Sequence, residues 1–241
     1  MCYGTLNLYL IQMLEIRYRV YVLNTNLEKL RISLENMHRC SRGWVHGNYV
    51  SLQRLIFATT SDLGELAKVH GRLSRLLVRL NNTFKCQVIS EVLSYIVTNI
   101  SYCYFIYLVS NGMIETIKSP FLWVANLSTG FLALLDINLL YWISHSTTHA
   151  FQETVHILQR YRTMPFTSHN LERQCEEFCL QLWQQETDMR IGGMFSLNRQ
   201  TSLAMGAFML RHTIILVQFD YESRISGATS SITIDSLVDM F

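Results

Sequence analysis

Apolar residues in this chain form either long continuous runs or spaced positions with a helical repeat. Three runs, at residues 88–109, 121–143 and 201–219, are long enough to cross a bilayer as helices. At a rise of about 1.5 Å per residue, the last run is about 28 Å long, close to the thickness of the hydrocarbon core. Residues 1–23 are also apolar, but charged residues interrupt the second half, which predicts only the cytoplasmic end of a spanning helix.

The segments 24–87 and 144–200 instead place apolar side chains at three- and four-residue steps, as amphipathic helices do. The first is expected to break at its SRGWVHGN motif. The second is expected to break at Pro165, after which Ser168 or Asn170 can cap the next helix. The pattern predicts an all-α, polytopic membrane protein with three full spans, a partial N-terminal span and long cytoplasmic anchor helices, in one membrane domain over residues 1–241.

Composition supports a membrane protein, because 49% of the residues are apolar and only 16% are charged, against roughly 25% charged in soluble domains. A net charge of +2 without a block of basic residues gives no reason to expect a nucleic-acid partner. The sequence contains no phosphate-binding loop, nucleophile elbow or catalytic triad, so no catalytic residues and no enzyme activity are expected.

No metal or cofactor is predicted either. The six cysteines form no CxxC pair that would indicate a zinc ribbon. His145, His149 and His156 share a helical face, but no third zinc ligand is placed beside them, so they are interpreted as part of a solvated surface.

Basic residues give the chain a direction across the membrane. Segment 24–87 contains ten lysines and arginines against four acidic residues, which predicts a cytoplasmic location. The segment 144–200 is then also cytoplasmic, and the tail at 220–241 is extracellular. The run 201–219 carries Arg211 in its middle and Gln218 near its end. Polar groups at bilayer depth usually face a bundle interior or a water-filled path, so this segment is a candidate pore or transport helix.

The motif GMFSLN at 193–198 precedes an apolar segment that closes with five residues, four of them apolar, and the Gln-Phe pair of Gln218 and Phe219. This arrangement is similar to the C-terminal signature of insect gustatory receptors. The stretch HGRLSRLLVRLNNTFKCQVI at 70–89 is also similar to the family's approach to its fifth span. The signature has Thr-Tyr before the five apolar residues, whereas this chain has Arg211 and His212.

The resemblance implies a chemosensory receptor subunit in the plasma membrane, acting as a non-selective cation channel gated by a small-molecule tastant. Such channels are homo- or heterotetramers, and their last helix lines the pore. The resemblance makes Gln218 and Phe219 the expected gate, with Val217, Ile214 and Arg211 nearby. The alternative is a truncated or diverged membrane subunit that does not conduct and has a regulatory or transporter-like role.

Helical geometry assigns further roles. Arg211 lies about 20° from Gln218 around the helix, whereas His212 lies about 120° away and is expected to contact a neighbouring helix. Four Arg211 side chains in a pore would repel cations, so an intramembrane ion pair between Asp136 and Arg211 is predicted from their similar depths. The alternative is that Arg211 reaches an aqueous vestibule. Tyr95 and Tyr102 are candidate ligand contacts within an aromatic cluster, although aromatic residues in spans more often pack against neighbours.

Overall fold

The computed structural model describes residues 3–41, 49–112, 120–162, 168–185, 190–191 and 195–238. These residues are all-α apart from one antiparallel pair of two-residue strands, in which Arg190 is opposite Ser196 and Ile191 is opposite Phe195. The elements in chain order are α1 (Tyr3–Ser41), α2 (Tyr49–Ser110), α3 (Pro120–Arg162), α4 (His169–Gln184), β1 (Arg190–Ile191), β2 (Phe195–Ser196) and α5 (Arg199–Val238).

These elements form two compact units. Unit 1 combines Met1–Val88 with Trp142–Asn198, and unit 2 combines Ile89–Tyr141 with Arg199–Phe241. Both α2 and α3 continue from one unit into the other without a break. The unit borders lie within two residues of the borders predicted between membrane spans and polar segments.

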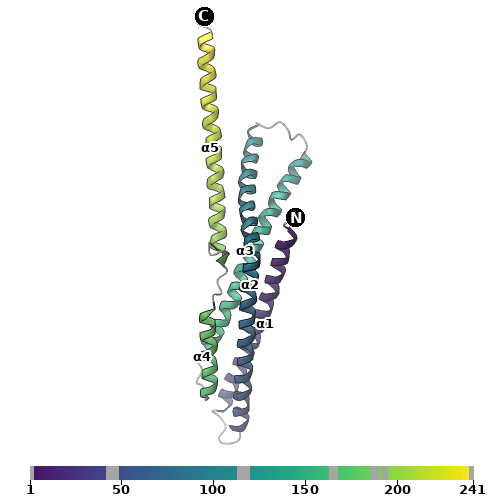
Figure 1. The fold of residues 1–241 in the computed structure, drawn as a ribbon, viewed down its shortest axis with the longest axis vertical. Coiled ribbons are helices and arrows are strands. Elements are labelled where there is room, and N and C mark those ends of the chain that lie inside the picture. The colour runs from purple at the N-terminus through teal and green to yellow at the C-terminus, as the bar shows by residue number, and fades with distance from the viewer. Residues whose placement is uncertain are drawn as a thin grey trace. The chain divides into compact units, whose positions relative to one another are not determined.

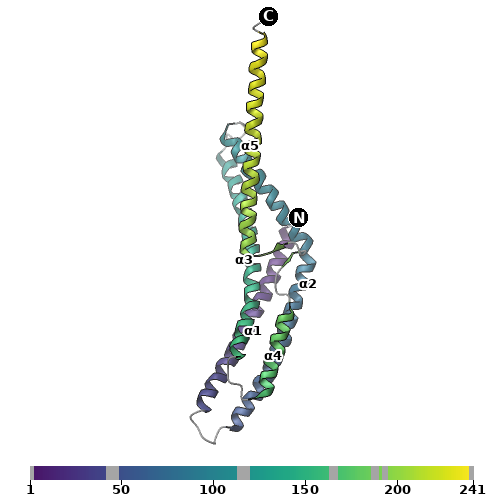
Figure 2. The same cartoon turned by 90° about the vertical axis from the view of Figure 1, so that its left-hand side faces the viewer.

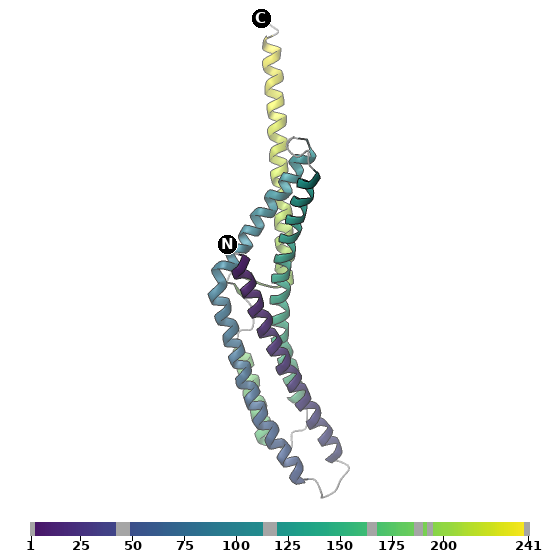
Figure 3. The same ribbon diagram turned by 90° about the vertical axis from the view of Figure 1, so that its right-hand side faces the viewer.

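Unit 1 is a bundle of α1, the first part of α2, the second part of α3, and α4, which lie side by side (Figures 1, 2 and 3). The spaced apolar positions of the polar segments form its core, as expected for amphipathic helices, together with buried apolar side chains from residues 6–23, the stretch predicted as a partial span. The largest fully buried side chains in this core include Tyr9, Met13, Leu27, Leu63, Phe151, Leu158, Tyr161 and Phe178.

Buried polar side chains join α1 to α3 in unit 1. The Asn24 amide donates to the carbonyl oxygen of Ala150 at 2.9 Å, and the Thr154 hydroxyl donates to Asn24 Oδ1 at 2.7 Å. Further along the pair, the Tyr161 hydroxyl donates to the carbonyl oxygen of Leu27 at 2.7 Å. A buried polar group is costly unless it is hydrogen bonded, so these bonds favour one alignment of the two helices over shifted ones.

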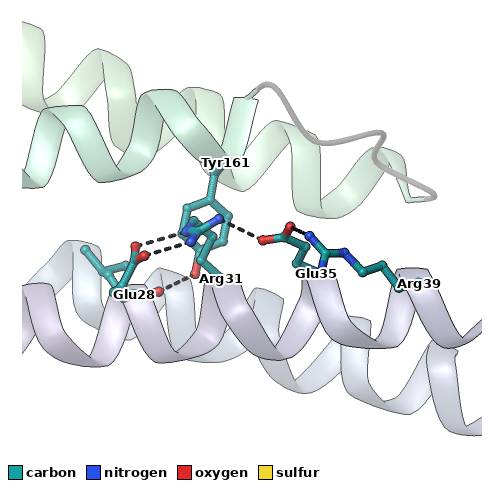
Figure 4. A network of polar contacts seen from close by, with 6 residues as sticks. Glu28, Arg31, Glu35, Arg39 and Tyr161 are labelled. Carbon is teal, nitrogen blue, oxygen red and sulfur yellow. Dashed lines mark hydrogen bonds and ion pairs between the residues drawn. The ribbon is translucent and has the colours of Figure 1, made fainter.

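Beside Tyr161, the surface of α1 carries a charged ladder (Figure 4). Arg31 contacts Glu28 through two nitrogens, at 2.8 and 3.0 Å, and reaches Glu35 with a third at 3.0 Å. Arg39 then pairs with the other oxygen of Glu35. The hydrogen bonds from Arg31 lower the pKa of Glu28. Such pairs at three- and four-residue spacing support a helix that extends into solvent.

The helix ends agree with the sequence signals. Helix α1 ends at Ser41 and α2 begins at Tyr49, on either side of the glycine-containing motif. Helix α3 ends at Arg162, and Ser168 occupies the N-cap position of α4 with extended backbone angles. Both predicted breaks are therefore confirmed, and Ser168 rather than Asn170 occupies the N-cap position, without a capping hydrogen bond from its side chain. Helix α5, however, continues through the predicted tail to Val238.

Two helices of the described residues, Gln53–Ser110 and Arg199–Ile225, are long and apolar enough to cross a membrane. A soluble core helix would bury its apolar window, but only 11% and 0% of these two windows are buried inside the chain. Exposed apolar surface of this length is what a helix presents to lipid or to other membrane helices. The predicted span 121–143 lies in α3, where several side chains are outside the described residues, and its crossing remains a prediction, as does that of 1–23.

Candidate pore helix

Helix α5 has two faces within unit 2. Met205, Met209, His212 and Thr213 are half-buried and recur at steps of one, three and four residues, so they form the face that packs on the rest of the unit. On this face the Tyr141 hydroxyl of α3 donates to Met205 Sδ at 2.9 Å. The His212 ring also meets Phe208 edge-on, with ring centroids 4.1 Å apart.

No side chain among the described residues covers the other face of α5. Ala204, Ala207, Arg211 and Gln218 are all exposed there, and Ile214 is 56% exposed. These residues belong to the face that helical geometry placed on one side with Gln218. Of the predicted gate residues, Phe219 is 67% exposed and Val217 is half-buried. A strip of small, apolar and polar side chains is therefore free to face other subunits or water.

The acidic partner predicted for Arg211 lies in the same unit. Asp136 on α3 and Arg211 on α5 are both exposed, and the ion pairs among the described residues include none between them. Their pairing therefore remains a prediction. A pair that forms only between neighbouring subunits leaves both side chains exposed in a single chain.

The two candidate ligand contacts, Tyr95 and Tyr102, are half-buried in α2. The Tyr102 ring lies against Gly130 of α3, where an added Cβ would be 2.8 Å from Tyr102 Cε1. This close approach shows that Tyr102 has a packing role in unit 2. A role for either tyrosine in ligand binding remains a prediction.

One contact of α5 was not anticipated. The Tyr107 hydroxyl, near the end of α2, donates to Asp220 Oδ2 at 3.4 Å, and Arg224 pairs with the same carboxylate at 2.9 Å. Asp220 directly follows the Gln-Phe pair, and its side chain is 18% exposed. The sequence showed Asp220 only as one of several charges after an apolar run. Its partner Tyr107 lies 113 residues away in the sequence, so no local pattern indicated this contact.

An apolar helix with an uncovered, partly polar face, in a chain whose described residues include a second long apolar helix, is typical of an all-α membrane protein. Sequence comparisons are consistent with this class. Residues 4–223 match the family described as 7tm chemosensory receptor, and the chain belongs to that family. This confirms the resemblance to insect gustatory receptors that the GMFSLN and Gln-Phe motifs indicated.

Two curated relatives from Drosophila melanogaster are similar over most of this chain. A protein named gustatory receptor 58a is 23% identical over 207 residues, covering 85% of this chain and 51% of the relative. A protein named gustatory receptor 85a is 26% identical over 183 residues, covering 72% of this chain and 44% of the relative. The chain thus spans about half the length of the curated relatives it matches.

Proposed function

We propose that this chain acts as a taste-receptor subunit of a ligand-gated, non-selective cation channel, with α5 lining the pore. The observation that carries the proposal is the uncovered face of α5, where Arg211 and Gln218 lie on a helix otherwise apolar enough to cross a membrane. Polar side chains at that depth are costly in lipid, and a water-filled path relieves the cost. The family membership supports a chemosensory role.

Four copies of α5, from identical or related subunits in the plasma membrane, would surround the pore with their uncovered faces inward. Gln218 and Phe219 would form the gate, with Val217 and Ile214 narrowing the path beside them. A ring of apolar side chains can close a pore by excluding water. A neighbouring ring of amide side chains leaves polar groups to solvate ions when the pore opens. A small-molecule tastant would act from a site that includes Tyr95 and Tyr102, and the C-terminus would be extracellular.

Arg211 would oppose cation passage unless its charge is neutralised. Asp136 of the same or a neighbouring subunit is the proposed partner. Reversing either charge, by Asp136→Arg or Arg211→Asp, should lower surface expression, and combining the reversals should restore it. Equal loss in the double variant and the single variants would show that the two residues do not pair.

The channel function is tested by agonist-evoked current in cells that express the chain alone or with related receptor subunits. Arg211→Gln should raise the cation current per surface-expressed subunit, because it removes positive charge from the pore. Arg199→Gln is the matched control, since Arg199 is exposed at the start of α5 before the predicted span. Normal surface expression without current in every combination would refute the channel.

The alternative function is a subunit that regulates or transports without conducting. It is favoured by Arg211 itself, which stands where the family signature has a neutral residue. In that case, adding this chain to a conducting relative should reduce the current, and Arg211→Gln should relieve the reduction.

A further inference from the structure

Helix α2 carries a basic stripe, defined here as Lys68, Arg72, Arg75 and Arg79. At about 100° per residue, these four side chains fall within an arc of about 60°. All four are exposed. The ion pairs among the described residues include none of the three arginines, whereas Arg19, Arg31 and Arg173 each pair with a glutamate on their own helix. The stripe therefore presents uncompensated positive charge.

One edge of the stripe borders a hollow between α2 and α4. This groove has a volume of about 650 Å³, and its lining includes Arg75, Arg79 and Val78 from α2 with Gln181 and Gln185 from α4. The Nε of Arg75 donates to the carbonyl oxygen of Gly71 at 3.1 Å, which uses one of the five N–H groups of the guanidinium and directs the side chain along its helix. None of the described lining residues is acidic.

The groove lies close to the predicted inner surface of the membrane. Val78 and Lys85 are seven residues apart and lie within about 20° of each other, so Lys85 continues the line of the groove toward the span. Counted from the predicted edge at Val88, Lys85 is about 5 Å and Arg79 about 13 Å into the cytoplasm. The headgroup region on each side of the hydrocarbon core is about 5–8 Å thick. On the same count Arg75 is about 20 Å into the cytoplasm, so a headgroup that projects from the membrane surface can contact Lys85 directly, and can contact Arg79 and Arg75 only through side chains that extend toward the membrane.

We propose that this groove binds the headgroup of a polyphosphorylated inositol lipid of the cytoplasmic leaflet. Two arginines at the rim can each form paired hydrogen bonds with a phosphate, which favours a headgroup with more than one phosphate. Clusters of basic residues directly cytoplasmic of a spanning helix attract anionic lipids in the same way. The assignment rests on the membrane orientation in the proposed function but does not require ion conduction.

The test uses the full chain purified in detergent and titrated with dioctanoyl phosphatidylinositol 4,5-bisphosphate, with binding followed by thermophoresis. Arg75→Gln/Arg79→Gln should weaken binding about twentyfold or more, since each basic residue near an anionic headgroup contributes a factor of about five. The control Lys29→Gln/Arg54→Gln removes the same charge from exposed positions of unit 1 away from the groove. It should change binding by less than about twofold, because it leaves the groove intact.

Two further arms separate the possible sources of the phosphate. Soluble inositol 1,4,5-trisphosphate should bind at least about tenfold more weakly than the lipid, because it lacks the membrane anchor. Val78→Glu, which places a carboxylate in the groove, should weaken lipid binding without removing an arginine. Equal weakening by the groove and control pairs, tight binding of the soluble trisphosphate, or no binding by the unaltered chain would each overturn the proposal. Size-exclusion profiles and helical circular dichroism confirm that the variants fold.

Discussion

A histidine ring without a hydrogen-bond partner lies in the core of unit 1. His70 is fully buried, and among the described residues neither ring nitrogen is hydrogen bonded. The ring packs edge-on against Phe151 and Phe178, at centroid distances of 5.2 and 5.8 Å. Burial lowers the pKa of His70 to about 4, and the neighbouring Gln185 side chain opposes only part of that shift. The ring is therefore neutral near pH 7.

Because of this environment, the free energy of unfolding of unit 1 falls as the pH is lowered. The unfolded chain binds a proton at His70 near pH 6.5 and the folded chain only near pH 4, so protons favour the unfolded chain between these values. Above pH 6.5 we expect the contribution of His70 to the free energy of unfolding to be constant. It should fall by about 3 kcal/mol as the pH drops to 4. Hydrogen exchange of peptides containing Phe151 and Phe178 measures this change.

His70→Leu should remove the pH dependence and stabilise unit 1 at pH 5, because leucine fills the site without unpartnered nitrogens. The control is His156→Gln, since His156 is exposed on α3. An unchanged pH profile in His70→Leu would show that other groups cause the acid sensitivity.

The Asn24–Thr154 bond gives a second prediction at a single residue. Thr154→Val keeps the shape of the side chain but leaves Asn24 Oδ1 buried without its donor, which costs about 1–3 kcal/mol of unfolding free energy. Thr148→Val is the control, because the Thr148 hydroxyl bonds only within its own helix, to Ser144 at 3.1 Å. Chemical unfolding monitored by circular dichroism compares the two variants. Equal losses would mean that the bond between helices contributes nothing of its own.

Between elements, α2 and α3 of unit 2 approach each other closely at Gly130. Gly130→Ala would place a Cβ 2.8 Å from Tyr102 Cε1, so we expect thermal destabilisation of roughly 1 kcal/mol or more. A smaller residue at position 102, as in Tyr102→Leu, should relieve the clash in the double variant. Gly206→Ala is the control, because nothing lies within 4 Å of its added Cβ, and alanine favours a helix. Additive effects of Gly130→Ala and Tyr102→Leu would exclude the contact.

Local signals explain which elements were predictable. Pro165 and the SRGWVHGN motif marked helix ends because they act on the backbone nearby, and the structure ends α3 and α1 at these signals. The continuation of α5 was not predicted, because loss of apolar character after Phe219 marks the end of a span and not the end of a helix. Asp220 and Arg224, paired at 2.9 Å with four-residue spacing, instead support the helix there.

For the whole molecule, the orientation of the chain can be measured directly. An epitope tag at the C-terminus should stain intact cells, because the charge of the polar segments predicts an extracellular tail. A tag inserted within 42–48, between α1 and α2, should stain only after permeabilisation. Staining of the second tag on intact cells would invert the topology and would also place the basic groove outside the cell.

Sequence periodicity predicted the all-α class and the division into apolar and polar segments, because each depends on residues near one another in the chain. It did not pair His70 with Phe151 and Phe178, or Asn24 with Thr154, since 130 residues separate the latter pair. The face of α5 around Gln218 was predictable from the helical repeat. The pore itself could not be predicted from the repeat, because it would form only where the α5 helices of several subunits meet.

Unit 1 is assembled from two separated stretches, Met1–Val88 and Trp142–Asn198. During synthesis, α1 and the first part of α2 therefore emerge long before α3 and α4 can cover their apolar sides. At about 5–20 residues per second, the roughly 110 residues from Val88 to Asn198 take about 5–20 seconds to be added. In that interval we expect a chaperone or the membrane surface to cover the apolar sides of α1 and the first part of α2. The synthesis of the intervening segment and of α3 and α4 thus sets the earliest moment at which the bundle can close.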